Sequence, residues 1–198
     1  MRIGKQMKLP LMVIALMLFS VIALNFLSTN VYAQQLVIDH GAPYDAAQWG
    51  QSGDEASAYA NVNTGYVQTH VARNSYAHAL VMGETVYSGS NLNKIAIYIT
   101  IKNSQLSKDG YGLSSVKLWA WIYDQTDNKQ IWAGFQDWVA ADATGKTLYW
   151  TNQAVNIYNG HKYSFWAGIQ ARSWTWWIFQ GWANADGTIF KIYACQWP

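Results

Sequence analysis

Residues 115–139 read SVKLWAWIYDQTDNKQIWAGFQDWV, and this stretch indicates the fold class. On both sides of a central QTDN, apolar side chains alternate with polar or aromatic ones, which is the two-residue period of a half-buried β-strand. Gln, Thr, Asp and Asn between two such runs are typical of a hairpin loop. We therefore predict an antiparallel hairpin over this stretch.

The matching of side chains across the hairpin predicts its register. With residues 125–128 as a four-residue loop, the facing pairs are Asp124 and Lys129, Ile122 and Ile131, Trp121 and Trp132, Ala120 and Ala133, and Leu118 and Phe135. A five-residue loop would scramble both faces, because a slip of one residue turns every side chain to the other face. In the predicted register one face is an apolar core face, made of Val116, Leu118, Ala120, Ile122, Ile131, Ala133 and Phe135.

The second face of the hairpin combines large rings with amides and a lysine. The candidate ligand-binding side chains on this face are Trp119, Trp121, Tyr123, Gln130, Trp132, Gln136 and Trp138. A buried amide without a partner costs about 1–3 kcal/mol, so we expect this face to be open to water at least in part. Indole rings can stack on the C–H faces of pyranoses while amides bond to hydroxyl groups, which is chemistry suited to carbohydrate. The same rings could instead fill a core or contact another protein, since an exposed apolar patch marks an interface of some kind.

The same alternation recurs along the rest of the chain. Residues 94–102 place four isoleucines on one face, as in a half-buried strand. Further strands are expected over about 65–72, 77–87, 115–124, 129–139, 161–170, 174–182 and 188–195, with turn residues between them. Residues 42–60 are the least regular and are expected to form a loop with a short helical turn. Many short strands predict an all-β fold, an antiparallel, jelly-roll-like β-sandwich.

The N-terminus has the order of an export signal. Three basic residues precede an apolar run over residues 9–27, and Ala33 ends a stretch suited to signal peptidase. We predict a signal peptide over 1–33 and a single Trp-rich β-sandwich domain over 34–198, in a secreted or cell-surface protein. An uncleaved leader would instead hold the domain at a membrane, because about nineteen apolar residues in a helix nearly span a bilayer core.

The charge balance excludes a nucleic-acid partner. Cleavage of the leader removes three of the thirteen basic residues, which leaves ten against eleven acidic ones. The mature chain then has no basic excess to attract a phosphate backbone. A charged content of 12% with 16% aromatic residues is also the opposite of a disordered composition.

The titratable residues form no recognised metal or cofactor motif, and we expect neither. The four histidines, which lack zinc-site spacing, are His40, His70, His78 and His161. Asp124 and Asp127 are assigned to the hairpin turn. Cys195, the only cysteine, is either a buried thiol or a partner in an intermolecular disulfide.

A small glycoside hydrolase is one alternative function. Such enzymes use two carboxyl groups about 5–10 Å apart. Asp137 is the carboxylate in the least usual position, because the predicted register turns it inward beside Phe135. We favour a non-catalytic domain and keep the hydrolase as an alternative.

The C-terminal two-thirds of the chain carries a resemblance to a known type of domain. Residues 80–195 contain the Ile-rich strand, the Trp hairpin, GHKYSFWAGI at 160–169 and GTIF at 187–190. In this order they resemble secreted jelly-roll domains of the carbohydrate-binding-module type, which implies sugar binding. The leading prediction is a secreted, non-catalytic domain that binds glycan or another polymer. A structural cell-surface protein that self-associates or contacts another surface protein is the alternative from a different class.

Overall fold

The computed structural model describes residues 35–198. The predicted signal peptide over 1–33 lies outside the described residues, and the domain boundary that follows it stays a prediction. The strands are β1 Leu36–Gly41, β2 Ala46–Ala60, β3 Tyr66–Val86, β4 Ile95–Lys108, β5 Ser114–Asp124, β6 Lys129–Asp137, β7 Lys146–Gln153, β8 Lys162–Ser173, β9 Thr175–Trp176, β10 Phe179–Gln180 and β11 Trp182–Gln196. In this part of the chain there is no helix able to cross a membrane. The predicted all-β antiparallel fold is confirmed.

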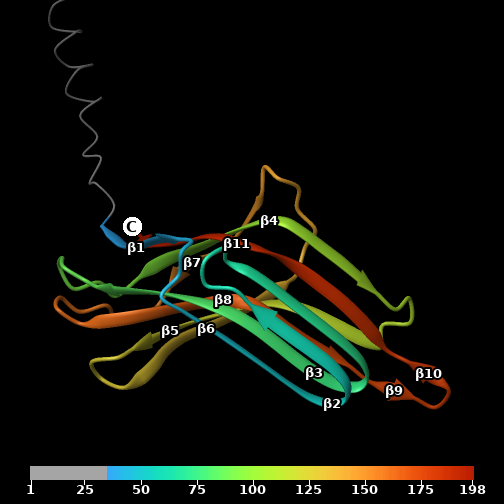
Figure 1. Cartoon of the computed structure of the whole chain (residues 1–198). Helices are drawn as coiled ribbons and strands as arrows, with labels where there is room; N and C mark the ends of the chain where they lie inside the picture. Colours follow the sequence, from blue (N-terminus) through green and yellow to red (C-terminus); the bar gives the residue numbers. More distant parts are fainter. Residues whose placement is uncertain (1–34) are drawn as a thin grey trace, which may run out of the picture. The chain divides into compact units, whose positions relative to one another are not determined.

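Nine of the strands form one antiparallel sheet that folds over itself into two layers (Figure 1). The order is β6-β5-β8-β3-β11-β4-β7, with β2 paired to β3 and β1 paired to β11. The first layer contains β5, β6, β8 and the parts of β2 and β3 next to β8, and the second contains β1, β4, β7, β11 and the remaining parts of β2 and β3. This is the β-sandwich that the sequence predicts. β9 and β10 form a separate two-stranded hairpin.

The strand β3 bends from one layer into the other. Its residues 66–72 pair with β11, whereas residues 76–86 pair with β8. At the change of partner Arg73 has a φ of 58°, and Gly53 on the neighbouring β2 has a φ of 101°. These left-handed conformations interrupt the extended backbone of both strands at the same place. The bend allows one long hairpin, β2–β3, to serve both layers.

Two predictions about this region are wrong. The strands expected over 65–72 and 77–87 are one continuous strand, β3, because the bend at Arg73 does not end it. The loop and helical turn expected over 42–60 are instead mostly the long strand β2. β2 is largely exposed, so it lacks the apolar alternation by which a half-buried strand is recognised.

The core between the layers combines large and small side chains. The four isoleucines of β4 are buried as the alternation predicts: Ile95, Ile97, Ile99 and Ile101. The first layer contributes both small side chains and large ones: Ala77, Ala79, Ala120, Ala167 and Ala171, and Leu118, Ile122, Phe165 and Ile169. Large and small residues of the two layers can interdigitate at the density of a native core.

The hairpin β5–β6 keeps the predicted four-residue loop but not the full register. Asp124 pairs with Lys129 as predicted, but Ile131 is then left without a partner, and Ile122 pairs with Trp132. This irregularity is a β-bulge, in which one extra residue on one strand turns all later side chains to the opposite face. The predicted register beyond the bulge is therefore wrong by one residue.

Cys195 lies fully buried on β11. Burial raises the pKa of its thiol, since the thiolate would lose its hydration. Of the two interpretations of this residue, the buried thiol is confirmed.

Candidate functional site

The side of the first layer that points away from the core carries a band of rings across four strands. Alternation places the core residues of β3, β5 and β8 on one side and the residues between them on the other. We call this second side the outer face; its main side chains are Tyr76, His78, Lys117, Trp119, Trp121, Tyr123, Phe135, Trp166, Gln170 and Arg172.

Four rings pack together in the middle of the outer face. Trp121 of β5 stacks on Trp166 of β8, with centroids 5.4 Å apart and planes at 13°. The ring centroid of Trp119 lies 4.4 Å from that of Trp121. Trp119 also stacks on Phe135 of β6, with ring centroids 5.8 Å apart and planes at 11°. Phe135 is 50% exposed and the three indoles are half-buried. Cross-strand aromatic neighbours of this kind stabilise a sheet and still leave ring surface accessible to a ligand.

The band of rings continues toward β3 and becomes more polar. His78 contacts Trp119 edge-on at 6.0 Å, and Tyr76 lies 5.5 Å from His78. Gln170 Nε2 donates a hydrogen bond of 3.2 Å to the Tyr76 hydroxyl. The guanidinium of Arg172 lies 5.3 Å from the centre of the Tyr76 ring. Amide, hydroxyl and guanidinium groups therefore border the apolar rings.

Gly168 allows the band to form. It lies on β8 between Trp119 of β5 and Leu80 of β3. A Cβ at this position would overlap the Ala79 carbonyl oxygen and approach the Leu80 Cα to 2.7 Å. The missing side chain thus permits close approach of β8 to β3, which is a known use of glycine inside a strand.

The predicted ligand-binding residues before the bulge are on the outer face. Trp119, Trp121 and Tyr123 are half-buried there, and Gln130 is exposed opposite Tyr123. The Tyr123 hydroxyl donates a hydrogen bond to Asn128 Oδ1 at 2.6 Å. A role for any of these residues in binding stays a prediction.

The predicted residues after the bulge leave the outer face and contact other strands. Trp132 Nε1 donates to Gln153 Oε1 at 3.0 Å, and its ring meets Trp150 of β7 edge-on at 5.1 Å. Gln136 Nε2 donates to a β7 carbonyl oxygen at 2.7 Å. Trp138 is only 2% exposed. The predicted location of Trp132, Gln136 and Trp138 beside Trp119 is wrong because the bulge reverses the faces of β6.

The bulge also reverses the faces of two residues that the predicted register turned toward the core. Phe135, expected in the core, is exposed on the outer face, and Asp137 is exposed and forms an ion pair with Lys117 at 2.5 Å. The Lys117 ammonium holds the pKa of Asp137 below its usual range. Hydrogen bonds from Lys162 and Gln125 likewise lower the pKa of Glu84, which lies at the far end of the outer face. A glycosidase general acid needs a raised pKa, so neither carboxyl group fits that role.

A pocket of about 390 Å³ lies at the end of the outer face beyond Tyr76. We call it the end pocket; it is lined by Ser52, Asn74, Ser75, Tyr76, Arg172, Ser173 and Trp174. No pattern in the sequence indicates this pocket. Its residues come from three segments that only the pairing of β2, β3 and β8 brings together.

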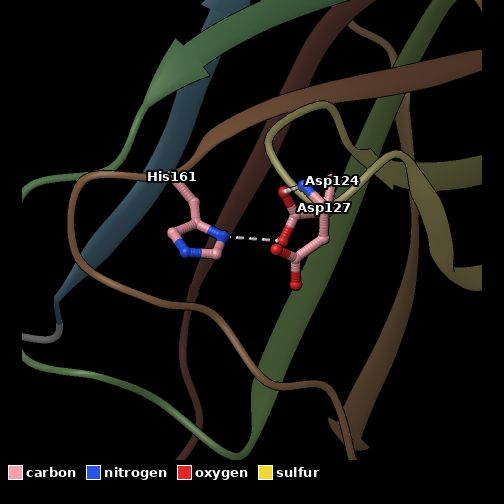
Figure 2. A group of neighbouring side chains, drawn as sticks. All are labelled: Asp124, Asp127 and His161. Carbon is pink, nitrogen blue, oxygen red and sulfur yellow. Dashed lines mark hydrogen bonds and ion pairs between the residues drawn. The ribbon is translucent and has the colours of Figure 1, made fainter.

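A buried acid organises the loops at the opposite ends of β5 and β8 (Figure 2). Asp124 Oδ1 accepts hydrogen bonds of 3.0 Å from the backbone N–H groups of Thr126 and Asp127, which closes an Asx turn. Its Oδ2 accepts one of 2.9 Å from His161 Nδ1. Burial alone would raise the pKa of Asp124, but these hydrogen bonds outweigh it and lower the pKa. The assignment of Asp124 and Asp127 to a turn is confirmed, whereas the sequence did not indicate the partner His161.

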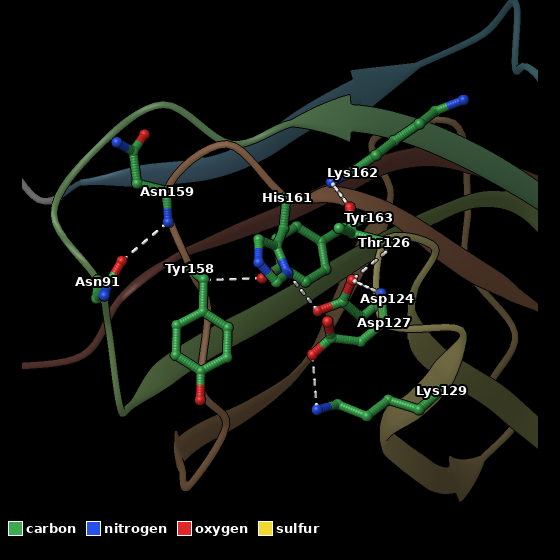
Figure 3. Close-up of polar contacts among 10 residues, drawn as sticks. All are labelled: Asn91, Asp124, Thr126, Asp127, Lys129, Tyr158, Asn159, His161, Lys162 and Tyr163. Carbon is green, nitrogen blue, oxygen red and sulfur yellow. Dashed lines mark hydrogen bonds and ion pairs between the residues drawn. The ribbon is translucent and has the colours of Figure 1, made fainter.

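Further hydrogen bonds connect the same loops (Figure 3). Backbone N–H groups before and at the start of β8 donate to nearby side chains: Tyr158 to the Tyr163 hydroxyl at 2.8 Å, Asn159 to Asn91 Oδ1 at 2.9 Å and Lys162 to Thr126 Oγ1 at 2.9 Å. The bond to Thr126 fixes the loop that carries His161 against the turn that carries Asp124, and the bond to Asn91 fixes it to the loop before β4.

The donor atoms of Asp124, Asp127 and His161 lie within 4.8 Å of one another, a spacing that a metal ion can use. However, Lys129 Nζ pairs with Asp127 Oδ2 at 2.9 Å, and the His161 ring already donates to Asp124. Asp127 is thus paired with a lysine, and both oxygens of Asp124 accept hydrogen bonds from protein groups. We interpret the three residues as a structural connection between the two loops.

A second aromatic surface lies on the β9–β10 hairpin, residues 174–182, which we call the apolar hairpin. Trp176, Trp177 and Ile178 are exposed at its tip, and Trp177 is 84% exposed with a φ of 57°. The hairpin projects from the end of the described domain that is remote from β1 (Figure 1). The strand predicted over 174–182 is therefore a short turn-containing hairpin rather than a strand of the sandwich.

No protein-family model matches this chain, and no curated protein matches it significantly. Among solved structures, it is similar to a family 61 carbohydrate-binding module in complex with β-1,4-galactotriose, with 10% identity and a TM-score of 0.34 over 74% of this chain and 86% of that one. It is also similar to a carbohydrate-binding module of Cellvibrio mixtus lichenase 5A in complex with cellotriose, with 13% identity and a TM-score of 0.31 over 82% and 98%.

A third similar structure is the N-terminal part of Clostridium thermocellum endo-1,4-β-D-xylanase 10B, with its CBM22-1 and GH10 modules, complexed with xylohexaose. The identity is 12% and the TM-score 0.33; the match covers 83% of this chain but only 29% of that one. The resemblance to carbohydrate-binding modules stated from the sequence is thus found among solved structures. At these identities and TM-scores it transfers neither a ligand nor a binding residue to this chain.

Proposed function

We propose that the domain binds carbohydrate, without catalysis, through the outer face. The observation that carries the proposal is the continuous band from Phe135 through Trp119 and Trp121 to Trp166, bordered by Gln170 and other polar side chains. Rings bind the apolar faces of a sugar, and the neighbouring amide and hydroxyl groups bind its hydroxyls. With the export signal predicted over 1–33, the binding would take place outside the cell.

The proposal is tested by screening the folded protein on a glycan array and titrating soluble oligosaccharides that bind. We expect quenching of the tryptophan fluorescence and, for Trp121→Ala, affinity about two- to tenfold lower, since a stacked ring contributes about 0.5–1.5 kcal/mol.

Trp49→Ala is the matched control. Trp49 is 53% exposed on β2, but it pairs with Ala79 and therefore points to the core side of the sheet. Its loss should leave affinity unchanged. An equal loss of affinity in both variants, or no binding on the array, would contradict a binding role for the outer face.

The exposed tip of the apolar hairpin favours a second candidate function, self-association or contact with another surface protein. Trp176, Trp177 and Ile178 are adjacent, bulky and exposed. An exposed apolar patch of this kind commonly marks an interface. The oligomeric state in solution tests this candidate independently of sugar binding.

A further inference from the structure

The end pocket presents an unusual set of polar groups, almost all of them donors. Asn74 Oδ1 accepts a hydrogen bond of 2.9 Å from the Thr175 N–H, which leaves the amide NH₂ of Asn74 to donate. The Tyr76 hydroxyl accepts one of 3.2 Å from Gln170 Nε2, which leaves its own O–H to donate. Arg172 adds a guanidinium, which has donors and no acceptor.

The charge of Arg172 is uncompensated within the described residues. Arg172 forms none of the ion pairs found there, although Lys117, on the adjacent strand, pairs with Asp137. The lining of the end pocket contains no acidic residue. The Tyr76 ring supports the guanidinium at 5.3 Å and leaves its N–H edge open.

We propose that the end pocket binds the carboxylate of an acidic sugar, a uronate, whose ring lies on the adjoining outer face. An ionised carboxylate only accepts hydrogen bonds, which matches the donors of Asn74 and Tyr76, and it pairs with Arg172 in a bidentate manner. Tyr76 belongs both to the end pocket and to the band of rings, so one saccharide can contact both. This assignment rests on the proposed sugar binding and names the class of sugar.

The test compares oligosaccharides of galacturonate, glucuronate and mannuronate with their methyl esters, which keep the sugar ring but lose the charge. Isothermal titration of the folded protein should show at least one acid bound about tenfold or more tightly than its ester. Added salt should weaken binding of the acid and not of the ester, because screening acts on the charge pair. Equal affinity for acid and ester across all three sugars would overturn the proposal.

Arg172→Gln should reduce the affinity for the acid about tenfold and leave the affinity for the ester unchanged. Arg73→Gln is the control, since Arg73 is an exposed arginine one strand away that does not line the pocket. If Arg172→Gln and Arg73→Gln lowered the affinity for the acid equally, general attraction by positive charge would explain the binding, and the assignment to the end pocket would be overturned.

The failures of the two proposals are distinguishable. Binding of neutral oligosaccharides that depends on Trp121 but shows no preference for acids would leave the outer face as the site and overturn only the uronate. Binding of an acid that depends on Arg172 but not on Trp121 would leave the end pocket as a site for acids and would overturn the binding role of the band of rings. Tighter binding of a sulfated oligosaccharide than of any uronate would show that the end pocket recognises a sulfate group, and it would overturn the assignment of a carboxylate.

Discussion

At the scale of single residues, Asp124 shows how a carboxylate can be buried without belonging to a catalytic site. Its side chain is fully buried, yet both oxygens accept hydrogen bonds, from two backbone amides and from His161. A buried charge is tolerated only with such partners. The pKa of Asp124 is lowered because the ionised form is the one that these donors stabilise.

Asp124→Asn is expected to destabilise the protein at neutral pH by about 1–3 kcal/mol, the cost of disturbing charged hydrogen bonds in a buried site. Because the pKa of Asp124 is lower in the folded than in the unfolded chain, its contribution is present above the ordinary value of 3.8 and is lost as the pH falls below it. Urea unfolding of both proteins at neutral pH and near pH 3 measures this difference, which should shrink in acid.

Asp142→Asn is the control for this prediction. Asp142 also accepts hydrogen bonds from backbone amides in an Asx turn, but it is exposed. Its replacement should have a much smaller effect at either pH. A difference between wild type and Asp124→Asn that stays constant down to pH 3 would contradict the role given to the ionised carboxylate.

At the scale of strands and hairpins, the bulge at Ile131 determines which rings a ligand can reach. It transfers Phe135 to the outer face and turns Trp132 toward Trp150 of β7. The contacts of Trp132 and Gln136 connect β6 to β7, the first and last strands in the main strand order of the sheet. Edge strands that are held by side-chain contacts are less available for pairing with another chain.

Gly168→Ala is expected to destabilise the domain by about 1–3 kcal/mol, because its methyl group would be forced into the backbone of β3. Thermal unfolding followed by circular dichroism measures the loss. Gly110→Ala is the matched control: a Cβ at Gly110 has no heavy atom within 4 Å and that residue has no positive φ. Unchanged stability of Gly168→Ala would show that β8 and β3 do not approach as closely as described.

At the scale of the whole domain, the two aromatic surfaces meet at one end. Trp174 lines the end pocket and is also the first residue of the apolar hairpin. The Trp174 N–H donates to the Leu113 carbonyl oxygen, and the Arg73 N–H donates to the Gly181 carbonyl oxygen. These backbone bonds fix the base of the hairpin to the sandwich, while its tip stays exposed.

If the apolar hairpin mediates self-association, Trp177→Ser should convert concentration-dependent oligomers to monomers in sedimentation velocity. The physical reason is the loss of a large ring that is 84% exposed and otherwise has no favourable environment. Tyr149→Ser, which removes an exposed ring far from the hairpin on β7, should leave the oligomeric state unchanged. A wild-type protein that is monomeric at every concentration would exclude the self-associating candidate.

The sequence by itself determined the fold class, the four-residue loop of β5–β6 and the core side chains of β4 and β5. These features depend on alternation and turn chemistry, which are local properties of a few neighbouring residues. Trp119 and Trp121 could be placed on the face opposite the core for the same reason.

Only the tertiary structure decided which side chains join those two rings. The bulge at Ile131 has no signature in the residue pattern, and it moved Trp132 and Phe135 to unexpected faces. Tyr76, Arg172 and the partner of Asp124 come from strands and loops far along the chain. Strand order depends on how the two layers close around a shared core, which is a property of all strands together, and the sites of this domain lie where those strands meet.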